Sequence, residues 1–134
     1  ALGEVTEVEG GTYAFMGTTT MYMEDFKVAA KIMTTITDVK DDLYFIDAGY
    51  KALGGPLGIV PKVEGYEESL TFQSIHDYYS ILKRNSNMDF EVGSILNLHS
   101  SQTDILVNRW DKFTCVRDGI VEKIIDITAR GCHN

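Results

Sequence analysis

A single histidine lies where an apolar run in the last third of the chain gives way to polar residues. The run 95–98 leads into His99, and hydroxyl and amide side chains follow at 100–103. If the run is a β-strand, it delivers an imidazole to a polar turn, where imidazole can bind zinc or manganese or carry a proton. Ser101 offers only a hydroxyl, which keeps its proton at neutral pH and is therefore a poor second ligand.

These residue types leave three interpretations of His99 open. It can be a partly exposed turn histidine without a metal, a ligand of a weak or substrate-assisted metal site, or an acid–base group. His76, beside Asp77, is a second catalytic candidate, although a surface turn histidine would have the same neighbours.

Three further reactive side chains have simpler expectations. Lys51 follows a predicted strand end and is expected in solvent, whereas a Schiff-base lysine is buried or lies beside another cation. Arg130 either pairs with an acid across a sheet or reaches a substrate carboxylate. Cys115 lies in an apolar run and is expected to point into the core as a small hydrophobe.

Composition limits the class of protein. The chain has 134 residues, of which 44% are hydrophobic, enough for one domain with a real core. Its 12 basic and 20 acidic residues give a net charge of −8, which disfavours binding to nucleic acid or to an anionic membrane. With two cysteines, no apolar stretch of transmembrane length and no signal-peptide pattern, a soluble cytoplasmic protein is expected.

The elements that must position these side chains are mainly strands. Asp41–Asp42 and Asp118–Gly119 are typical of hairpin turns. The predicted fold is a compact antiparallel barrel or sandwich, mainly β, with one or two short helical turns. Its β-branched and aromatic strand segments are 12–15, 31–37, 43–46, 57–60, 70–72, 95–98, 112–116 and 120–128.

Two segments are ambiguous, and one aromatic residue is too. Residues 21–30 favour one or two helical turns, and residues 75–82 have helical spacing but also a weak strand alternation. Tyr13 alternates with Phe15 on one strand face, so it either packs in the core or contacts a cofactor.

Five short motifs resemble, in the same order, motifs of the C-terminal β-domain of D-threonine aldolases and D-serine dehydratases. These are the metal-activated pyridoxal-phosphate enzymes of the alanine-racemase-like fold type. Residues 7–15 are similar to the family's E-x-R-P-G-T-Y-x-F, and residues 46–53 to its V-D-A-G-x-K-A-L. The other similar segments are 93–99, 116–119 and 129–131.

The resemblance implies a two-domain enzyme in which a (β/α)-barrel carries the Schiff-base lysine and a β-domain closes over its mouth. Residues 1–18 would then be a remnant of the last barrel strand and its connection, and residues 19–134 the β-domain. Gly11, Thr12 and Tyr13 would contact the phosphate of pyridoxal phosphate through their backbone. The cofactor is not expected to bind to this chain alone.

The resemblance also implies roles for both histidines. His99 matches the family histidine that binds a divalent metal, zinc or manganese, and Ser101 stands where the family has Cys or Asp. His76 stands where the family carries E-E-H, but both acids are missing here. His99 and His76 are therefore the predicted catalytic residues, with His99 and a weakened Ser101 as the metal position.

The function implied is a lyase that acts on small D-hydroxyamino acids by aldol cleavage or dehydration, inactive without its barrel. A module derived from this domain, which stands alone and pairs as a homodimer through the surface that once faced the barrel, is the alternative. A metal-binding β-protein unrelated to these enzymes is a third possibility.

Overall fold

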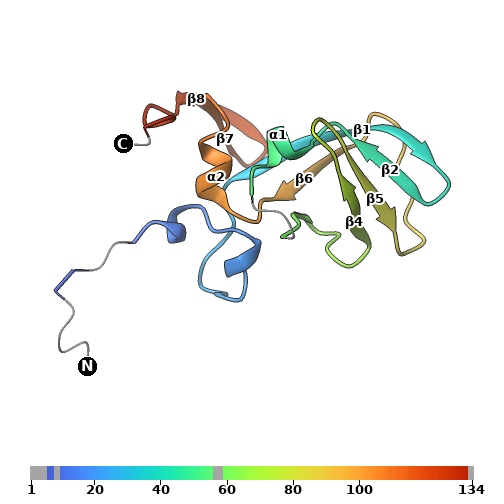
Figure 1. The fold of residues 1–134 in the computed structure, drawn as a ribbon, viewed down its shortest axis with the longest axis horizontal. Coiled ribbons are helices and arrows are strands. Elements are labelled where there is room, and N and C mark those ends of the chain that lie inside the picture. Colours follow the sequence, from blue (N-terminus) through green and yellow to red (C-terminus); the bar gives the residue numbers. More distant parts are fainter. Residues whose placement is uncertain (1–5, 8–9, 56–58, 133–134) are drawn as a thin grey trace.

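The computed structural model describes residues 6–7, 10–55 and 59–132, and most of its regular structure is β (Figure 1). The short helices are two 3₁₀ turns, η1 (Thr12–Ala14) and η2 (Thr18–Thr20), and two α-helices, α1 (Tyr50–Leu53) and α2 (Thr103–Val107). No helix among these described residues is long enough to cross a bilayer. The strands are β1 (Lys31–Lys40), β2 (Leu43–Ile46), β3 (Lys62–Val63), β4 (Leu70–Ile75), β5 (Ser80–Arg84), β6 (Ile95–His99), β7 (Lys112–Arg117) and β8 (Ile120–Asp126).

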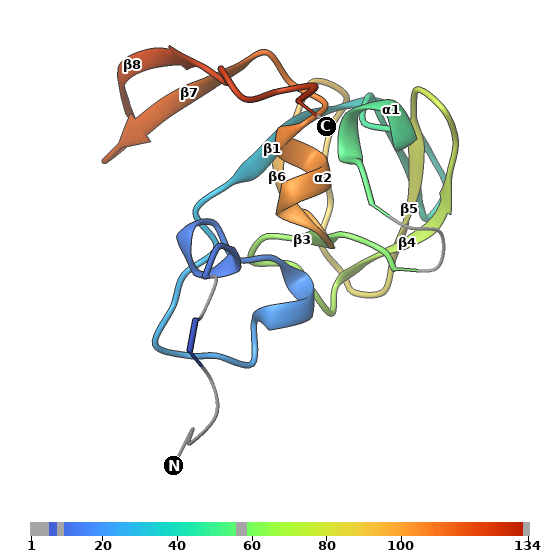
Figure 2. The same cartoon turned by 60° about the vertical axis from the view of Figure 1, so that its left-hand side comes forward.

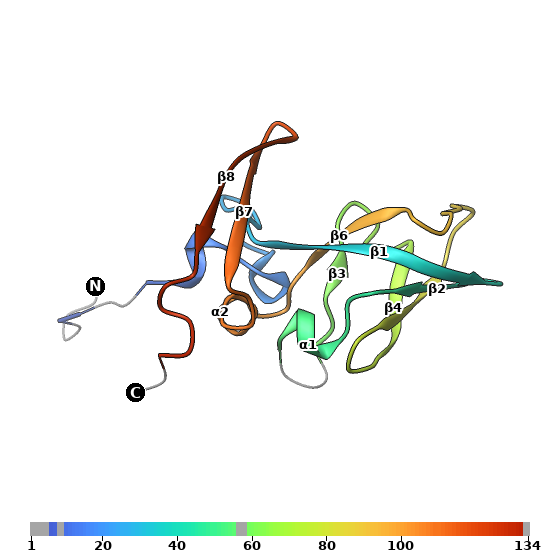
Figure 3. The same ribbon diagram turned by 90° about the horizontal axis from the view of Figure 1, so that it is seen from above.

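Six strands form one antiparallel sheet in the order β3-β6-β1-β2-β5-β4. The sheet curls until β3 and β4 come close to each other, so it is a nearly closed barrel. The predicted antiparallel β fold is therefore confirmed. Strands β7 and β8 form a separate two-stranded hairpin that stands away from the barrel (Figures 2 and 3).

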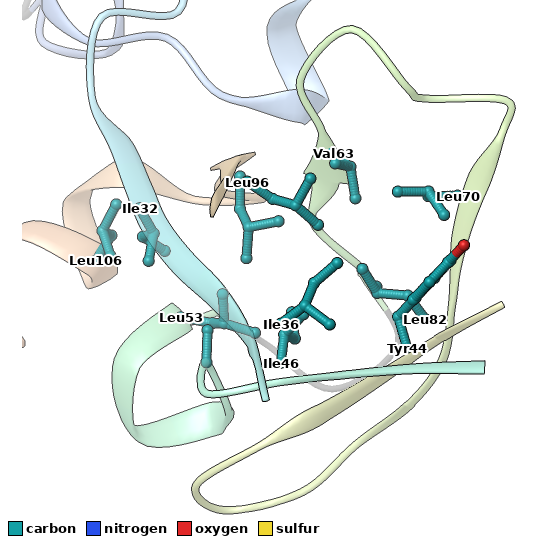
Figure 4. Packing of buried hydrophobic residues seen from close by; sticks show 12 residues of the cluster. Ile32, Ile36, Tyr44, Ile46, Leu53, Val63, Leu70, Leu82, Leu96 and Leu106 are labelled. Atoms are coloured by element: carbon teal, nitrogen blue, oxygen red, sulfur yellow. The ribbon is translucent and has the colours of Figure 1, made fainter. Parts of the chain in front are cut away.

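The core lies inside the barrel because side chains alternate along its strands. In β1, Ile32 and Ile36 point inward and are at most 5% exposed, while Lys31 and Met33 on either side of Ile32 point outward. Tyr44 and Ile46 of β2 meet them from the next strand, and the inward side chains converge in Figure 4. The other labelled members of this cluster are Leu53, Val63, Leu70, Leu82, Leu96 and Leu106.

Both predicted hairpin turns are present. Asp41, with φ 56°, lies between β1 and β2, and Asp118 and Gly119, with φ 50° and 77°, join β7 to β8. The two successive positive φ values at Asp118 and Gly119 are what a tight two-residue hairpin turn requires. Short polar residues and glycine tolerate a positive φ.

Several local predictions were wrong. Residues 12–15 were predicted as a strand, but Thr12–Ala14 form the 3₁₀ helix η1. Residues 21–30 contain turns and no helix, and the only helical turn nearby is η2, just before them. Of the predicted strand 57–60, residues 57–58 lie outside the described residues, and 59–60 are not in a strand.

Other side chains also differ from expectation. The ambiguous segment 75–82 is the end of β4, a turn and the start of β5, so its strand interpretation was right. Tyr13 does not pack in the core, because η1 replaces the expected strand and leaves this side chain 61% exposed. Cys115 is only half-buried, because it lies in the projecting β7–β8 hairpin rather than in the barrel.

Candidate functional site

Polar side chains from three neighbouring strands share one outer patch of the barrel wall. Lys31 on β1 pairs in register with His99 on β6, and Lys62 on β3 pairs with His99 from the other side. The ladder continues where the N–H of Glu64 donates to the carbonyl of Asn97 at 2.9 Å. Since Val63 and Leu98 point into the core, their neighbours Glu64, Asn97 and His99 point outward together with Lys31.

A covering segment, residues 16–28, folds over this patch. The N–H of Thr18 donates to the carbonyl of Ser100 at 2.9 Å, and the hydroxyl of Thr19 lies 3.3 Å from the carbonyl of Ser101. Within the segment, Met16 is buried against the barrel. His99 is therefore only 6% exposed, so the first of its three interpretations, a partly exposed turn histidine, is wrong.

Between the covering segment and the barrel wall lies a cleft of about 270 Å³. His99 lines this cleft, and neither Nδ1 nor Nε2 of its buried ring has a hydrogen-bond partner among the described residues. The nearest charged atom recorded is Oε1 of Glu64, 3.6 Å from Nε2, which is too long for a hydrogen bond. The other lining residues are Met16, Met21, Phe26, Lys27, Val28, Lys31 and Glu64.

Burial without hydrogen bonds to the protein costs the imidazole free energy, so this burial does not by itself stabilise the fold. A binding or catalytic role is one of the explanations for an unsatisfied buried polar group, and the position of His99 in a cleft favours it. Both ring nitrogens are therefore available to hydrogen-bond with a ligand that enters the cleft.

Glu64 is the charged centre of the patch. Its carboxylate forms an ion pair with the ammonium of Lys31 and accepts a hydrogen bond from the amide of Asn97 at 3.2 Å. The hydrogen bond from Lys31 lowers the pKa of Glu64 below its usual value, although partial burial acts in the opposite direction. The carboxylate beside His99 is therefore ionised at neutral pH.

Ser101 does not join His99 in the cleft. It is 1% exposed, and its Oγ faces Gly55, where an added Cβ would lie 2.5 Å from that oxygen. Ser101 is also absent from the cleft lining, and no group of three His, Cys, Asp or Glu side chains that could hold a metal exists among the described residues. The predicted pair of metal ligands thus does not fit a complete metal site.

His76 lies elsewhere. It is exposed at the turn between β4 and β5, its ring stacks on Tyr79 at 4.4 Å, and its Nε2 lies 3.1 Å from the hydroxyl of Ser74. No hydrogen bond or ring contact with His99 is recorded in the described part of the chain. Gly49 packs so closely under this turn that a Cβ there would meet the carbonyl of His76 at 2.4 Å, which explains the glycine of the 46–53 motif.

The predicted cofactor-binding residues form an exposed turn. Gly11 precedes η1, and no other atom lies within 4 Å of the position that a Cβ on it would take. The N–H groups of Thr12 and Tyr13 donate to no other described residue, so this backbone is accessible to an anion such as a phosphate. The open space fits the predicted role, which stays a prediction.

Lys51 lies in solvent as expected, and Arg130 makes an ion pair, the first of its two alternatives. Lys51 is exposed, and its ammonium lies 3.9 Å from the ring centre of Tyr78. Arg130 pairs with Asp111 at 2.9 Å.

Sequence reasoning missed Lys31 and Glu64 as members of the site. Alternation along the predicted strand 31–37 would have placed Lys31 on one face with Met33, but its meeting with Glu64 depends on β1 and β3 flanking β6 in the sheet order.

Comparisons with known proteins agree with this fold. Residues 29–116 match the family described as "Putative serine dehydratase domain". The chain is 32% identical to a D-threonine aldolase from Arthrobacter sp, over 98% of its own length and 36% of that protein.

Two solved structures are also similar. One is a D-threonine aldolase from Filomicrobium marinum, 25% identical with a TM-score of 0.86, covering 98% of this chain and 37% of that one. The other is a metal-free mutant of a D-threo-3-hydroxyaspartate dehydratase, 16% identical with a TM-score of 0.68 over 91% of this chain and 38% of that one; it supports the fold alone. The chain thus spans a little over a third of the length of these relatives.

Proposed function

Because the chain belongs to the family of putative serine dehydratase domains, we propose that it forms the C-terminal β-domain of a pyridoxal-phosphate-dependent lyase. The substrates would be small D-hydroxyamino acids, and the reaction aldol cleavage or dehydration. The observation that carries this proposal is His99, a buried imidazole with two unpartnered nitrogens that faces a cleft.

In this proposal the chain supplies a wall of the active site. The bound cofactor would provide the electron sink for breaking a bond at the substrate's α-carbon. His99 would hold or move a proton at the substrate hydroxyl, and the backbone of Gly11 to Tyr13 would contact the cofactor phosphate. The Schiff-base lysine would come from the part of the relatives that this chain does not span, since Lys51 is exposed.

The partners and surroundings follow the same reasoning. The net charge of −8 favours neither nucleic acid nor an anionic membrane as a partner, and a cytoplasmic location is proposed. A bound zinc or manganese ion would have only His99 and the shared carboxylate of Glu64 as protein donors in the described residues, so we expect metal binding to be weak.

A chimera tests this function. This chain would replace the corresponding third of the Arthrobacter D-threonine aldolase, and cleavage of D-threonine and dehydration of D-serine would be assayed. We expect one of the two activities, and a fall of about 100-fold or more in kcat for His99→Ala. His76→Ala, away from the cleft, is the matched control. A folded, cofactor-loaded chimera that is inactive on both substrates would contradict the proposal.

A second function has an observation in its favour. Strands β7 and β8 expose apolar side chains, among them Val116, Ile120, Val121 and Ile124, each more than half exposed. Such a surface favours a binding or dimerisation module derived from the domain, in which a second copy covers the hairpin.

A further inference from the structure

In the cleft, the ammonium of Lys31 and the imidazole of His99 both approach the same oxygen of Glu64. Lys31 and His99 are cross-strand neighbours on β1 and β6, and Glu64 follows β3 on the far side of β6. The side chain of Lys31 therefore reaches across the strand that carries His99 to form its ion pair with Glu64. The same oxygen of Glu64 lies 3.6 Å from Nε2 of His99.

This arrangement disfavours the binding of a divalent cation between His99 and Glu64. A metal between His99 and Glu64 would have to displace the ammonium of Lys31 or lie beside it, and like charges at such separations repel strongly in a partly buried site. The hydroxyl that might have added a third donor, Ser101, is packed against Gly55. Neither charge nor donor number favours zinc or manganese here.

We propose that Lys31 takes the place of the divalent cation in this cleft. Its ammonium, anchored by Glu64, supplies the positive charge that binds an oxygen of the substrate, a hydroxyl or a carboxylate. His99, with both nitrogens unpartnered, remains available for the proton of that group. The identity of the substrate rests on the proposed function, whereas the replacement of a metal by an ammonium does not.

Metal binding to the purified chain tests the replacement directly. Equilibrium dialysis against Zn²⁺ and Mn²⁺ would compare the unmodified chain with Lys31→Glu, which would create a cluster of two carboxylates and one imidazole on neighbouring strands. Lys62→Glu is the matched control: Lys62 also pairs with His99 in register, but it does not line the cleft. Both substitutions change the net charge equally.

We expect the unmodified chain and Lys62→Glu to bind neither metal specifically, and Lys31→Glu to bind one equivalent at least about tenfold more tightly. Adding His99→Ala to Lys31→Glu should abolish this gain. One equivalent of metal bound by the unmodified chain and lost in His99→Ala would overturn the proposal. So would a folded Lys31→Glu variant with no more affinity than Lys62→Glu.

Circular dichroism checks that each variant folds, and Lys31→Met, which removes the charge without adding a carboxylate, provides a second test with a smaller expected gain. In the active chimera, a chelator should leave kcat within about twofold and Lys31→Arg should retain more activity than Lys31→Met. Chelator-sensitive activity restored by Mn²⁺ would overturn the proposal. An inactive chimera with the expected dialysis results would contradict the lyase function alone.

Discussion

The hydroxyl of Ser101 occupies the space that a side chain at Gly55 would need. An added Cβ at Gly55 would lie 2.5 Å from Oγ of Ser101, and Gly55 has φ +119°, a conformation that L-residues with side chains rarely adopt. The absence of a side chain at Gly55 therefore leaves room for the hydroxyl of Ser101, and this packing role of Ser101 needs no metal.

Gly55→Ala should destabilise the fold by about 1–3 kcal/mol, because it adds backbone strain and a close contact with Ser101. Urea denaturation would measure this change. Gly65→Ala is the matched control, since Gly65 also has a positive φ, +74°, but its Cβ would meet nothing within 4 Å. Equal losses in the two variants would show that the contact with Ser101 contributes nothing.

His99→Phe should leave the stability of the chain unchanged or raise it by about 1 kcal/mol. The slightly larger apolar ring removes two buried nitrogens that have no hydrogen-bond partner in the described structure. His76→Phe, on an exposed ring, should have little effect. A loss of several kcal/mol in His99→Phe, measured by urea denaturation at neutral pH, would mean that the imidazole is hydrogen-bonded in solution.

The stabilising effect of Glu64 should depend on pH. Its pKa is lowered in the folded state, mainly by the hydrogen bond from Lys31, so the contribution is present above the unfolded pKa and is lost as the pH falls through the folded pKa. Urea denaturation of the unmodified chain and of Glu64→Gln should give curves that separate near neutral pH and converge in acid. Asp126→Asn, which breaks the exposed pair with Lys112, should show a smaller separation, and parallel curves for Glu64→Gln would contradict the assignment.

If a second copy covers the β7–β8 hairpin, Ile124→Glu should convert a dimer into a monomer, because it places a charge in an apolar contact. Light scattering after size exclusion would measure the mass. Ile95→Glu is the matched control, since Ile95 on β6 is exposed to the same extent, 63%. A monomer at all concentrations, before any substitution, would remove the homodimer from consideration.

The parts of the fold that local chemistry determines could be predicted from the sequence. The turns at Asp41 and Asp118 depend on residues that tolerate a positive φ, and the β6 strand depends on its own apolar run. At residues 12–15 the predicted strand is replaced by η1, and Phe15 packs on Phe113, with ring centres 5.3 Å apart, a long-range contact that no local pattern contains.

The site was only half predictable for the same reason. His99 could be found from its place at the end of a strand, but its burial results from a segment that precedes it by more than seventy residues and crosses over the barrel wall. The spacing of His99 and Ser101 suggested that both bind one metal ion, yet the hydroxyl of Ser101 faces Gly55. Glu64 and Lys31 meet only because the sheet order places their strands on either side of β6.

Hydrogen bonds to the backbone carbonyl oxygens of Ser100 and Ser101 hold the covering segment on the barrel. These acceptors do not depend on the side chains at positions 100 and 101. Met21, Phe26 and Val28 line the cleft without taking part in those two hydrogen bonds. Substitutions at these three positions can therefore change the shape of the cleft and the ligands that fit it, while the two hydrogen bonds that hold the covering segment persist. Under the proposed function, substitutions at these three positions would change substrate preference without altering His99.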